Sequence, residues 1–262
     1  MIERNYELND ILSYLDDLAP AELAENWDNV GLMIGARNNA PLKNVVLSLD
    51  VTREALNLCE KVQASLLITH HPLFFPPVSS INYATPMGAL IRDFIRKDIC
   101  VYSAHTNLDK AHGGVNYVLA EAVGLSMPMS ITGVPIGMCG DLNESASLFS
   151  IIRKIKKILG ADGVFRNMDE DMQIARIFVI GGSFEKEIIP SLAKAHVDLV
   201  ISGEIKYHQM LELRSLGIAA VAMGHDVSER VILPSLEKRF NLQFPGLGVA
   251  IAGGLDYNKI VF

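Results

Sequence analysis

The sequence predicts an α/β protein of two duplicated halves, whose mostly parallel, buried sheets face a cleft. Short apolar runs alternate with amphipathic helical patterns along the chain, which is typical of βαβ units with parallel strands. The order of these patterns recurs in the second half at an offset of about 131 residues. Polar side chains follow several of the apolar runs. We expect the first half at residues 1–125 and the second at 126–262, with no inserted domain.

Composition narrows the class of protein. The chain has 262 residues, of which 50% are hydrophobic and 20% charged, as in an ordinary globular domain. Its net charge of −7 argues against nucleic-acid binding and against docking on anionic membranes. No apolar run reaches the ~18 residues of a membrane span, and the N-terminus lacks the pattern of a signal peptide. We therefore expect a soluble cytoplasmic protein whose three cysteines are buried and reduced.

The first half begins with an amphipathic helix from Leu8 to Leu18, closed by Pro20. Apolar runs bounded by polar residues predict buried strands, and helical periodicity predicts helices between them. Thr85 is the expected N-cap of one helix, with Pro86 at its first position, and Gly124 is the expected end of another. The strands are expected at 45–49, 65–69 and 99–104, the last continuing through 106–109, and the helices at 53–63, 86–95 and 113–123.

The second half repeats this order. Residues 126–140 are rich in Met, Pro and Gly and are expected to join the halves. A helix is expected from Leu148 to Leu159, ending at Gly160, with its basic residues on a solvated face. Strands are expected at 177–180, 199–202 and 218–224, with helices at 184–195 and after 208.

Histidine and carboxylate side chains follow the expected strands. In open α/β sheets, ligands bind beyond the carboxyl ends of the strands, so these positions are candidates for chemistry. If the residues after Gly224 are helical, a histidine and a glutamate four residues apart share one face. The candidates are His70, His71, His105 and Asp109 in the first half and Glu204, His208, His225 and Glu229 in the second.

Imidazole and carboxylate groups without thiolates suit zinc, iron or manganese, and a purely structural zinc site is less expected. Adjacent histidines diverge, so a pair can serve two ions, or one ion and one substrate group. Two flanking segments hold aromatic rings. The run Leu73–Pro77 is expected to form a wall of the site. For Glu25–Leu32, which contains Trp27, we favour a structural role over a role in a binding site.

Five motifs, in order, resemble the dinuclear-metal-centre hexameric protein family, whose members are also described as GTP cyclohydrolase 1 type 2 homologues or NGG-interacting-factor-like proteins. The resemblance covers nearly the whole chain, although residues 140–171 leave no room for the domain that some relatives insert. The motifs are Glu25–Gly31, Thr69–Pro72, Ser103–Asp109, Ser202–Glu204, and Gly224-His225 with Glu229.

The resemblance implies a cleft with two divalent ions bound by His70, His71, Asp109, His225 and Glu229. Glu229 is expected to bridge them. It further implies that His105, Glu204 and His208 line the same cavity, and we predict that His105 and Glu204 move protons during catalysis.

This ligand set predicts metal-dependent hydrolysis by a metal-bridging hydroxide. The resemblance to GTP cyclohydrolase 1 type 2 homologues implies a nucleotide, or another phosphorylated small molecule, as the substrate. An anionic substrate is favoured because two divalent ions leave the site positive. The alternative is a non-enzymatic metal-handling or partner-binding hexameric protein. A turnover assay separates these two classes, whereas the sequence does not.

We predict from the resemblance that the protein is a homohexamer. The apolar, methionine-containing middle segment agrees with this, since such a segment is unfavourable on the surface of a monomer. Size exclusion coupled to light scattering should give six times the 28.7 kDa of one chain. A monomer would contradict the assignment.

Overall fold

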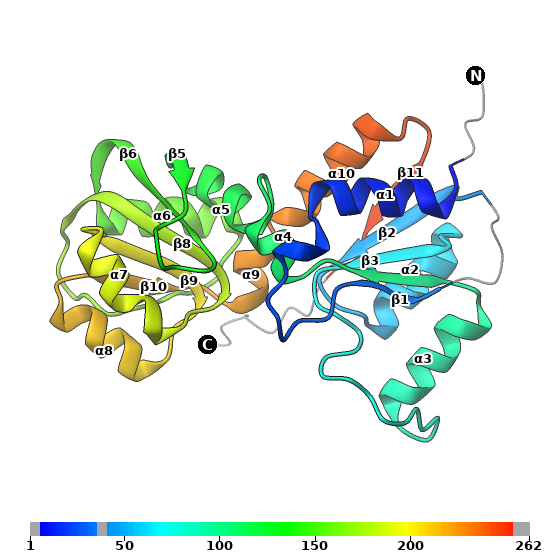
Figure 1. Cartoon of the computed structure of the whole chain (residues 1–262). Coiled ribbons are helices and arrows are strands. Elements are labelled where there is room, and N and C mark those ends of the chain that lie inside the picture. Colours follow the sequence, from blue (N-terminus) through cyan, green and yellow to red (C-terminus); the bar gives the residue numbers. More distant parts are fainter. Residues whose placement is uncertain (1–5, 36–40, 254–262) are drawn as a thin grey trace. The chain divides into compact units, whose positions relative to one another are not determined.

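The computed structural model describes residues 6–35 and 41–253, which form two compact units. The first unit contains residues up to 111 together with 233–253, and the second contains residues 112–232. Each unit has its own sheet and hydrophobic core (Figure 1). This division differs from the expected boundary at 125, because the chain passes from one unit to the other at Ala111 and again at Ile232.

The first sheet has the strand order β1-β4-β3-β2-β11. Strands β11, β2, β3 and β4 pair in parallel, and β1 closes the edge antiparallel to β4, so the expectation of a mostly parallel sheet is confirmed here. The bounds are β1 Gly31–Ile34, β2 Asn44–Ser48, β3 Leu66–Thr69, β4 Cys100–Ser103 and β11 Gly248–Ile251.

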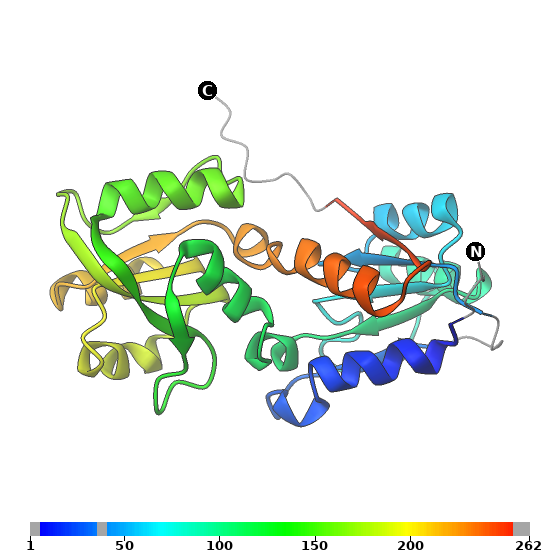
Figure 2. The same cartoon turned by 90° about the horizontal axis from the view of Figure 1, so that it is seen from above.

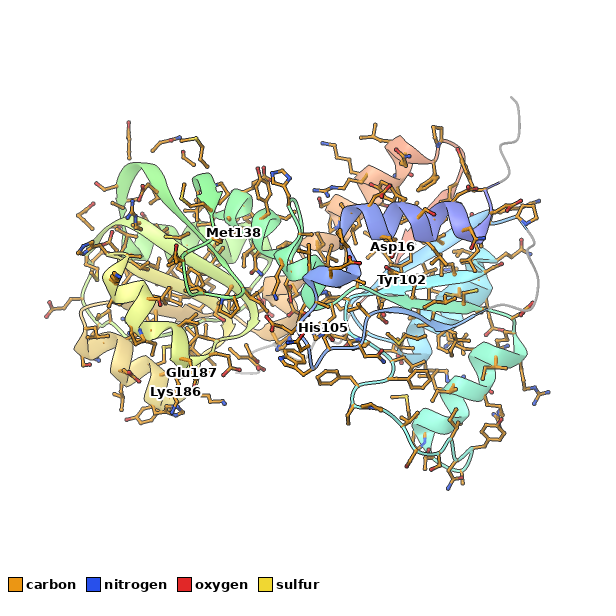
Figure 3. The ribbon with its side chains drawn as sticks, in the orientation of Figure 1. Asp16, Tyr102, His105, Met138, Lys186 and Glu187 are labelled. Carbon is orange, nitrogen blue, oxygen red and sulfur yellow. The ribbon has the colours of Figure 1, made fainter. Side chains whose placement is uncertain are left out.

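Helices cover both faces of this sheet. The helices α2 and α3 pack their apolar sides on Val46, Leu67 and Val101, whereas α1 and α10 lie side by side on the opposite face (Figures 1 and 2). The Tyr102 hydroxyl of β4 donates to Asp16 Oδ1 of α1 at 3.1 Å (Figure 3). The bounds are α1 Leu8–Leu18, η1 Ala21–Leu23, α2 Arg53–Val62, α3 Pro86–Arg96, α4 Thr106–Lys110 and α10 Ile232–Gln243.

The second sheet has the order β5-β6-β8-β9-β10-β7, and only its centre, β8-β9-β10, is parallel. Antiparallel strands add to both sides, so the expectation of a mostly parallel sheet is wrong for this unit. The bounds are β5 Ser126–Met129, β6 Met138–Ser147, β7 Phe165–Arg166, β8 Gln173–Ser183, β9 Leu199–Glu204 and β10 Ala219–Ala222.

The helices of the second unit also form two layers. Those that pack on Ile177, Val179 and Ile201 are α5 and α6, and those on the other face are α7 and α8. The bounds are α5 Val115–Val123, α6 Leu148–Leu159, η2 Lys186–Ile188, α7 Ile189–Lys194, α8 Tyr207–Ser215 and α9 His225–Glu229. No described helix of either unit is long and apolar enough to cross a bilayer.

The expected duplication is confirmed by the topology. The chain order α1-β1-β2-α2-β3-α3-β4-α4 of the first unit recurs as α6-β7-β8-α7-β9-α8-β10-α9 in the second. In each repeat three parallel strands have the same order, and an antiparallel strand lies beside the last of them. The helix and strand that end each repeat, α5-β5 and α10-β11, belong to the unit of the other repeat. This exchange explains why the chain passes between the units twice, after Ala111 and after Ile232.

Two local predictions are corrected. Residues 126–140, expected as a connection, contain β5 and the start of β6, which add to the β8 side of the second sheet in antiparallel pairing. Pro128 in β5 and Gly140 in β6 interrupt the alternation of apolar and polar residues that is typical of strands. Residues 106–109, expected to continue a strand, form α4, because the Thr106 backbone turns after His105 to bond with Asp28.

Candidate metal centre

In the first unit the parallel register of the strands places three histidines together. Thr69 pairs with Ser103 at the ends of β3 and β4. His71 and His105 each follow two positions later, so they also lie next to each other. The ligating atoms of His70, His71 and His105 lie within 4.8 Å of one another. Three imidazoles that converge in this way could hold a metal ion.

Each of the three histidines is oriented through its Nδ1 atom. His70 Nδ1 donates to the Ala104 carbonyl oxygen at 3.0 Å. His71 Nδ1 and His105 Nδ1 lie 2.7 Å and 2.8 Å from carboxylate oxygens of Asp50 and Asp28, respectively. Because carbonyl and carboxylate oxygens only accept, Nδ1 carries the proton, and Nε2 of the neutral ring carries the lone pair. Histidine ligands of metals are typically held by this kind of hydrogen bond.

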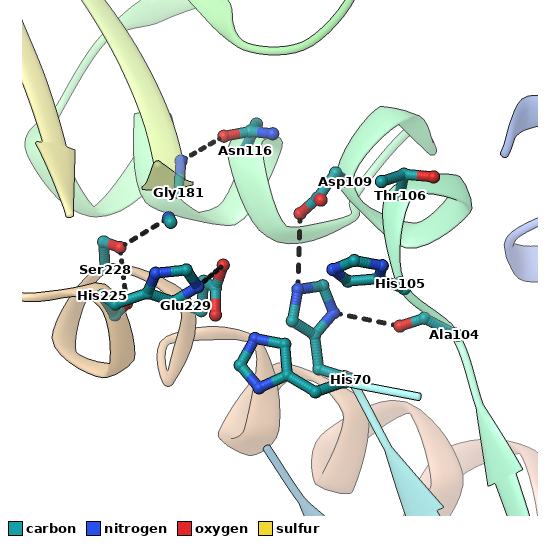
Figure 4. Close-up of polar contacts among 12 residues, drawn as sticks. His70, Ala104, His105, Thr106, Asp109, Asn116, Gly181, His225, Ser228 and Glu229 are labelled. Carbon is teal, nitrogen blue, oxygen red and sulfur yellow. Dashed lines mark hydrogen bonds and ion pairs between the residues drawn. The ribbon is translucent and has the colours of Figure 1, made fainter. Parts of the chain in front are cut away.

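Asp109 extends this group from α4. Its Oδ1 lies 3.7 Å from His70 Nε2 (Figure 4). Two ligand atoms about 2.1 Å from one tetrahedral ion are about 3.4 Å apart, so the observed separation is close to that of a shared ion. Both atoms are electron donors, and a cation bound between them would stabilise their approach. The residues present therefore fit a divalent ion.

His105 is held by an aspartate that the sequence did not single out. The Asp28 side chain has no exposed area and accepts from His105 Nδ1, from the Thr106 backbone N–H and from the Thr106 hydroxyl. Burial by itself would raise the pKa of Asp28, but these hydrogen bonds outweigh it and hold that pKa well below its usual range. Asp28 is therefore a fixed anion behind His105.

In the second unit, His225 and Glu229 stand one turn apart on α9, as the spacing predicted. His225 Nε2 lies 3.2 Å from Glu229 Oε1 (Figure 4), and His225 Nδ1 lies 3.3 Å from Glu204 Oε2. Glu229 is buried, whereas Glu204 is exposed and accepts from the Ser183 hydroxyl at 3.0 Å. His225 Nε2 and Glu229 Oε1 could therefore contribute two ligands to a divalent ion, whereas Glu204 contacts the opposite nitrogen of the ring.

Glycines allow α9 to approach the ends of β8 and β9. A Cβ on Gly182, whose φ is +64°, would collide with Glu229 Oε1. A Cβ on Gly203 would lie 2.6 Å from both the Gly182 carbonyl oxygen and Ser228 Oγ. The Ser228 hydroxyl accepts from the Gly182 N–H at 2.9 Å and donates to the His225 carbonyl oxygen at 2.7 Å (Figure 4). These contacts fix the start of α9 against the sheet.

Two aspartates that orient histidines, Asp50 and Asp28, were not among the candidates from the sequence. Asp50 follows a strand adjacent to that of His71, so its position at a carboxyl end was a usable signal. Asp28 lies in a loop far from His105 in the sequence, and only the Glu25–Gly31 motif marked it. His208 is exposed on α8, and its role stays a prediction.

The fold and these side chains define an α/β protein with duplicated halves, in which histidine and carboxylate groups at strand ends could hold divalent metal. The model of the family Duf34/NIF3 (NGG1p interacting factor 3) matches residues 6–253, and the chain belongs to this family. The resemblance seen in the sequence motifs is thereby confirmed.

Curated relatives carry a common description. A Clostridium perfringens protein described as GTP cyclohydrolase 1 type 2 homolog is 34% identical over 239 residues, which cover 89% of this chain and 90% of that protein. A Helicobacter pylori protein described as GTP cyclohydrolase 1 type 2 is 32% identical and covers 85% of this chain and 87% of its own length.

Solved structures agree on the fold. A Bacillus cereus protein described as related to NIF3 superposes with a TM-score of 0.85 at 22% identity, over 99% of this chain and 100% of that one. Reduced HcgD from Methanocaldococcus jannaschii superposes with a TM-score of 0.82 at 25% identity, over 96% and 99% of the two chains.

Gly182→Ala should displace the Glu229 carboxylate and lower the amount of zinc that the protein retains. Gly217→Ala is the matched control, because Gly217 also has a positive φ, of +73°, but no atom lies within 4 Å of its added Cβ. Both variants incur backbone strain of about 1 kcal/mol, so thermal unfolding should shift in both. Elemental analysis after dialysis should show a loss in Gly182→Ala alone. Equal zinc in both variants would contradict the steric argument.

Proposed function

We propose that the chain is a metal-dependent hydrolase that binds two divalent ions and acts on a nucleotide or another phosphorylated small molecule. The proposed ligands are those of the family resemblance, His70, His71, Asp109, His225 and Glu229. The observation that carries the proposal is the cluster of imidazoles in the first unit, in which the hydrogen bonds from Nδ1 of His70 and His71 leave the lone pair on Nε2, the atom that would bind metal. Structural histidines need no such convergence.

The charge of the ligand set supports an anionic substrate. Two divalent ions exceed the negative charge of Asp109 and Glu229, so the site attracts phosphate although the chain as a whole is acidic. When bound, such ions act as Lewis acids and lower the pKa of water enough for hydrolysis near neutral pH. The description of the relatives adds GTP to the substrates that need testing.

His105 is the proposed proton carrier. The Asp28 carboxylate faces its Nδ1, which fixes the ring and stabilises the imidazolium form when Nε2 takes up a proton. Glu204 is the second proposed carrier, since its carboxylate is exposed beside His225. A homohexamer remains the proposed assembly, and zinc, iron and manganese remain the proposed metals.

A turnover assay tests the function. The purified full chain, reconstituted in turn with zinc, iron and manganese, is incubated with GTP, other nucleotides and simple phosphoesters. Metal-dependent release of a hydrolysis product that a chelator abolishes is the expected result. Two ions bound per chain without turnover of any substrate would favour the metal-handling alternative instead.

Replacing His105 by alanine should lower turnover about a hundredfold or more, because a positioned proton carrier contributes that much. The metal content should stay at two ions per chain. Asp28→Asn should show a weaker version of the same change, since it keeps the shape but removes the anion that orients His105. A drop from two ions to one in His105→Ala would make His105 a ligand and overturn this division of roles.

Replacing Glu229 by glutamine should remove both ions, because a carboxylate can bind one ion with each oxygen and reduces the repulsion between them. His70→Ala and His71→Ala should each weaken mainly one ion. Glu212→Gln on the exposed side of α8 is the control, and it should retain both ions. Elemental analysis of dialysed protein measures the outcome. Two tightly bound ions in Glu229→Gln would place the bridge at Asp109 or at a solvent oxygen.

A further inference from the structure

Two exposed aromatic side chains stand beside His105 in the first unit. Trp27 is 60% exposed and Phe75 is 50% exposed, although both are large and apolar. Their ring centroids are 5.7 Å apart, and those of Trp27 and Phe75 lie 6.2 Å and 6.0 Å from the centroid of His105. The three rings are nearly perpendicular to one another, with interplanar angles of 72° to 74°.

The segments that hold these rings are tied down by polar contacts. Asp28, directly after Trp27, accepts the hydrogen bonds from His105 and Thr106 described above. Asn29 Nδ2 donates to the carbonyl oxygen of Phe74, directly before Phe75, at 2.7 Å. These hydrogen bonds connect the two segments to each other and to the end of β4. The backbone segments that carry both rings are therefore held in place before any ligand arrives.

Exposed rings on anchored segments differ from ordinary core aromatics. A structural tryptophan is mostly buried, because removing its apolar area from water is what stabilises the fold. Here the contacts that fix the segments are polar, and much of the ring area stays in water. Because the two rings are nearly perpendicular, a planar group can stack on the face of one ring while its edge meets the other. Aromatic side chains bind nucleobases by stacking in this way, with little dependence on which base is present.

We propose that Trp27 and Phe75 form a stacking surface for a planar heteroaromatic ring, the base of a nucleotide bound at the histidine cluster. The inference rests on the proposed function, since the phosphate of the same molecule would bind the metal centre. Purines cover more ring area than pyrimidines and should bind more tightly. Stacking alone does not distinguish guanine from adenine, so AMP and GMP should bind alike at this surface.

Trp27 is the only tryptophan in the sequence, so intrinsic tryptophan fluorescence reports on this surface alone. Zinc-loaded full-length protein is titrated with AMP, GMP, adenosine and ribose 5-phosphate. The two nucleotides and adenosine should quench the fluorescence saturably, whereas ribose 5-phosphate should leave it nearly unchanged. Calorimetry supplies the affinity of ribose 5-phosphate, which gives no optical signal.

Phe75→Leu removes one ring but keeps an apolar side chain. It should lower the affinity for AMP about tenfold while leaving the affinity for ribose 5-phosphate and the zinc content unchanged. Phe165→Leu is the matched control, because Phe165 is an 81% exposed phenylalanine on β7 of the second unit. Trp27→Phe should bind AMP more tightly than Trp27→Leu, as measured by calorimetry.

The outcomes separate the inference from the proposed function. Equal affinity for AMP and ribose 5-phosphate, with no effect of Phe75→Leu, overturns the stacking surface and leaves the phosphate site standing. Binding of adenosine without binding of ribose 5-phosphate supports the stacking surface and counts against the phosphate site. An equal loss of affinity for AMP in Phe75→Leu and Phe165→Leu also overturns the stacking surface.

Discussion

The parallel register of β2, β3 and β4 is the constraint on which the first-unit site depends. Pairing of Ser48 with Thr69, and of Thr69 with Ser103, aligns the carboxyl ends of three strands. The hydroxyls of Thr69 and Ser103 bond to each other at 2.9 Å, and Thr69 also donates to the His71 carbonyl oxygen. A shift of one residue in either pairing would turn the side chains to the other face of the sheet and disperse the imidazoles.

The second unit reaches a similar arrangement by close packing. Its histidine and glutamate come from a single short helix, so their separation is fixed by helical spacing alone. The sheet leaves room for that helix at Gly182 and Gly203, and Ser228 of the helix accepts a hydrogen bond from the Gly182 N–H. The two repeats thus share a topology but orient their polar groups by different interactions. Hydrogen bonds donated by Nδ1 orient the histidines of the first, and close packing of α9 against the strand ends orients the polar groups of the second.

Because the final helix and strand of each repeat are exchanged, each unit contains residues of both repeats. Helix α5 supplies Leu119 and Val123 to the core of the second unit, and α10 places Phe240 against Tyr14 of α1 in the first. Asn116 of α5 also accepts from the Gly181 N–H at 2.7 Å, at the end of β8. Residues of the first repeat therefore support the strand end beside the polar group of the second repeat.

The sequence by itself determined the α/β class, the duplication, most strands and helices, and the histidine and carboxylate candidates, because these follow from local periodicity and from polar residues at strand ends. It also predicted the shared helical face of His225 and Glu229. Only the tertiary structure decided that Asp28 holds His105, that Phe75 stands beside Trp27, and that α5 and α10 change units. Those contacts join residues far apart in the chain, and local pattern carries no information about which distant partner a side chain meets.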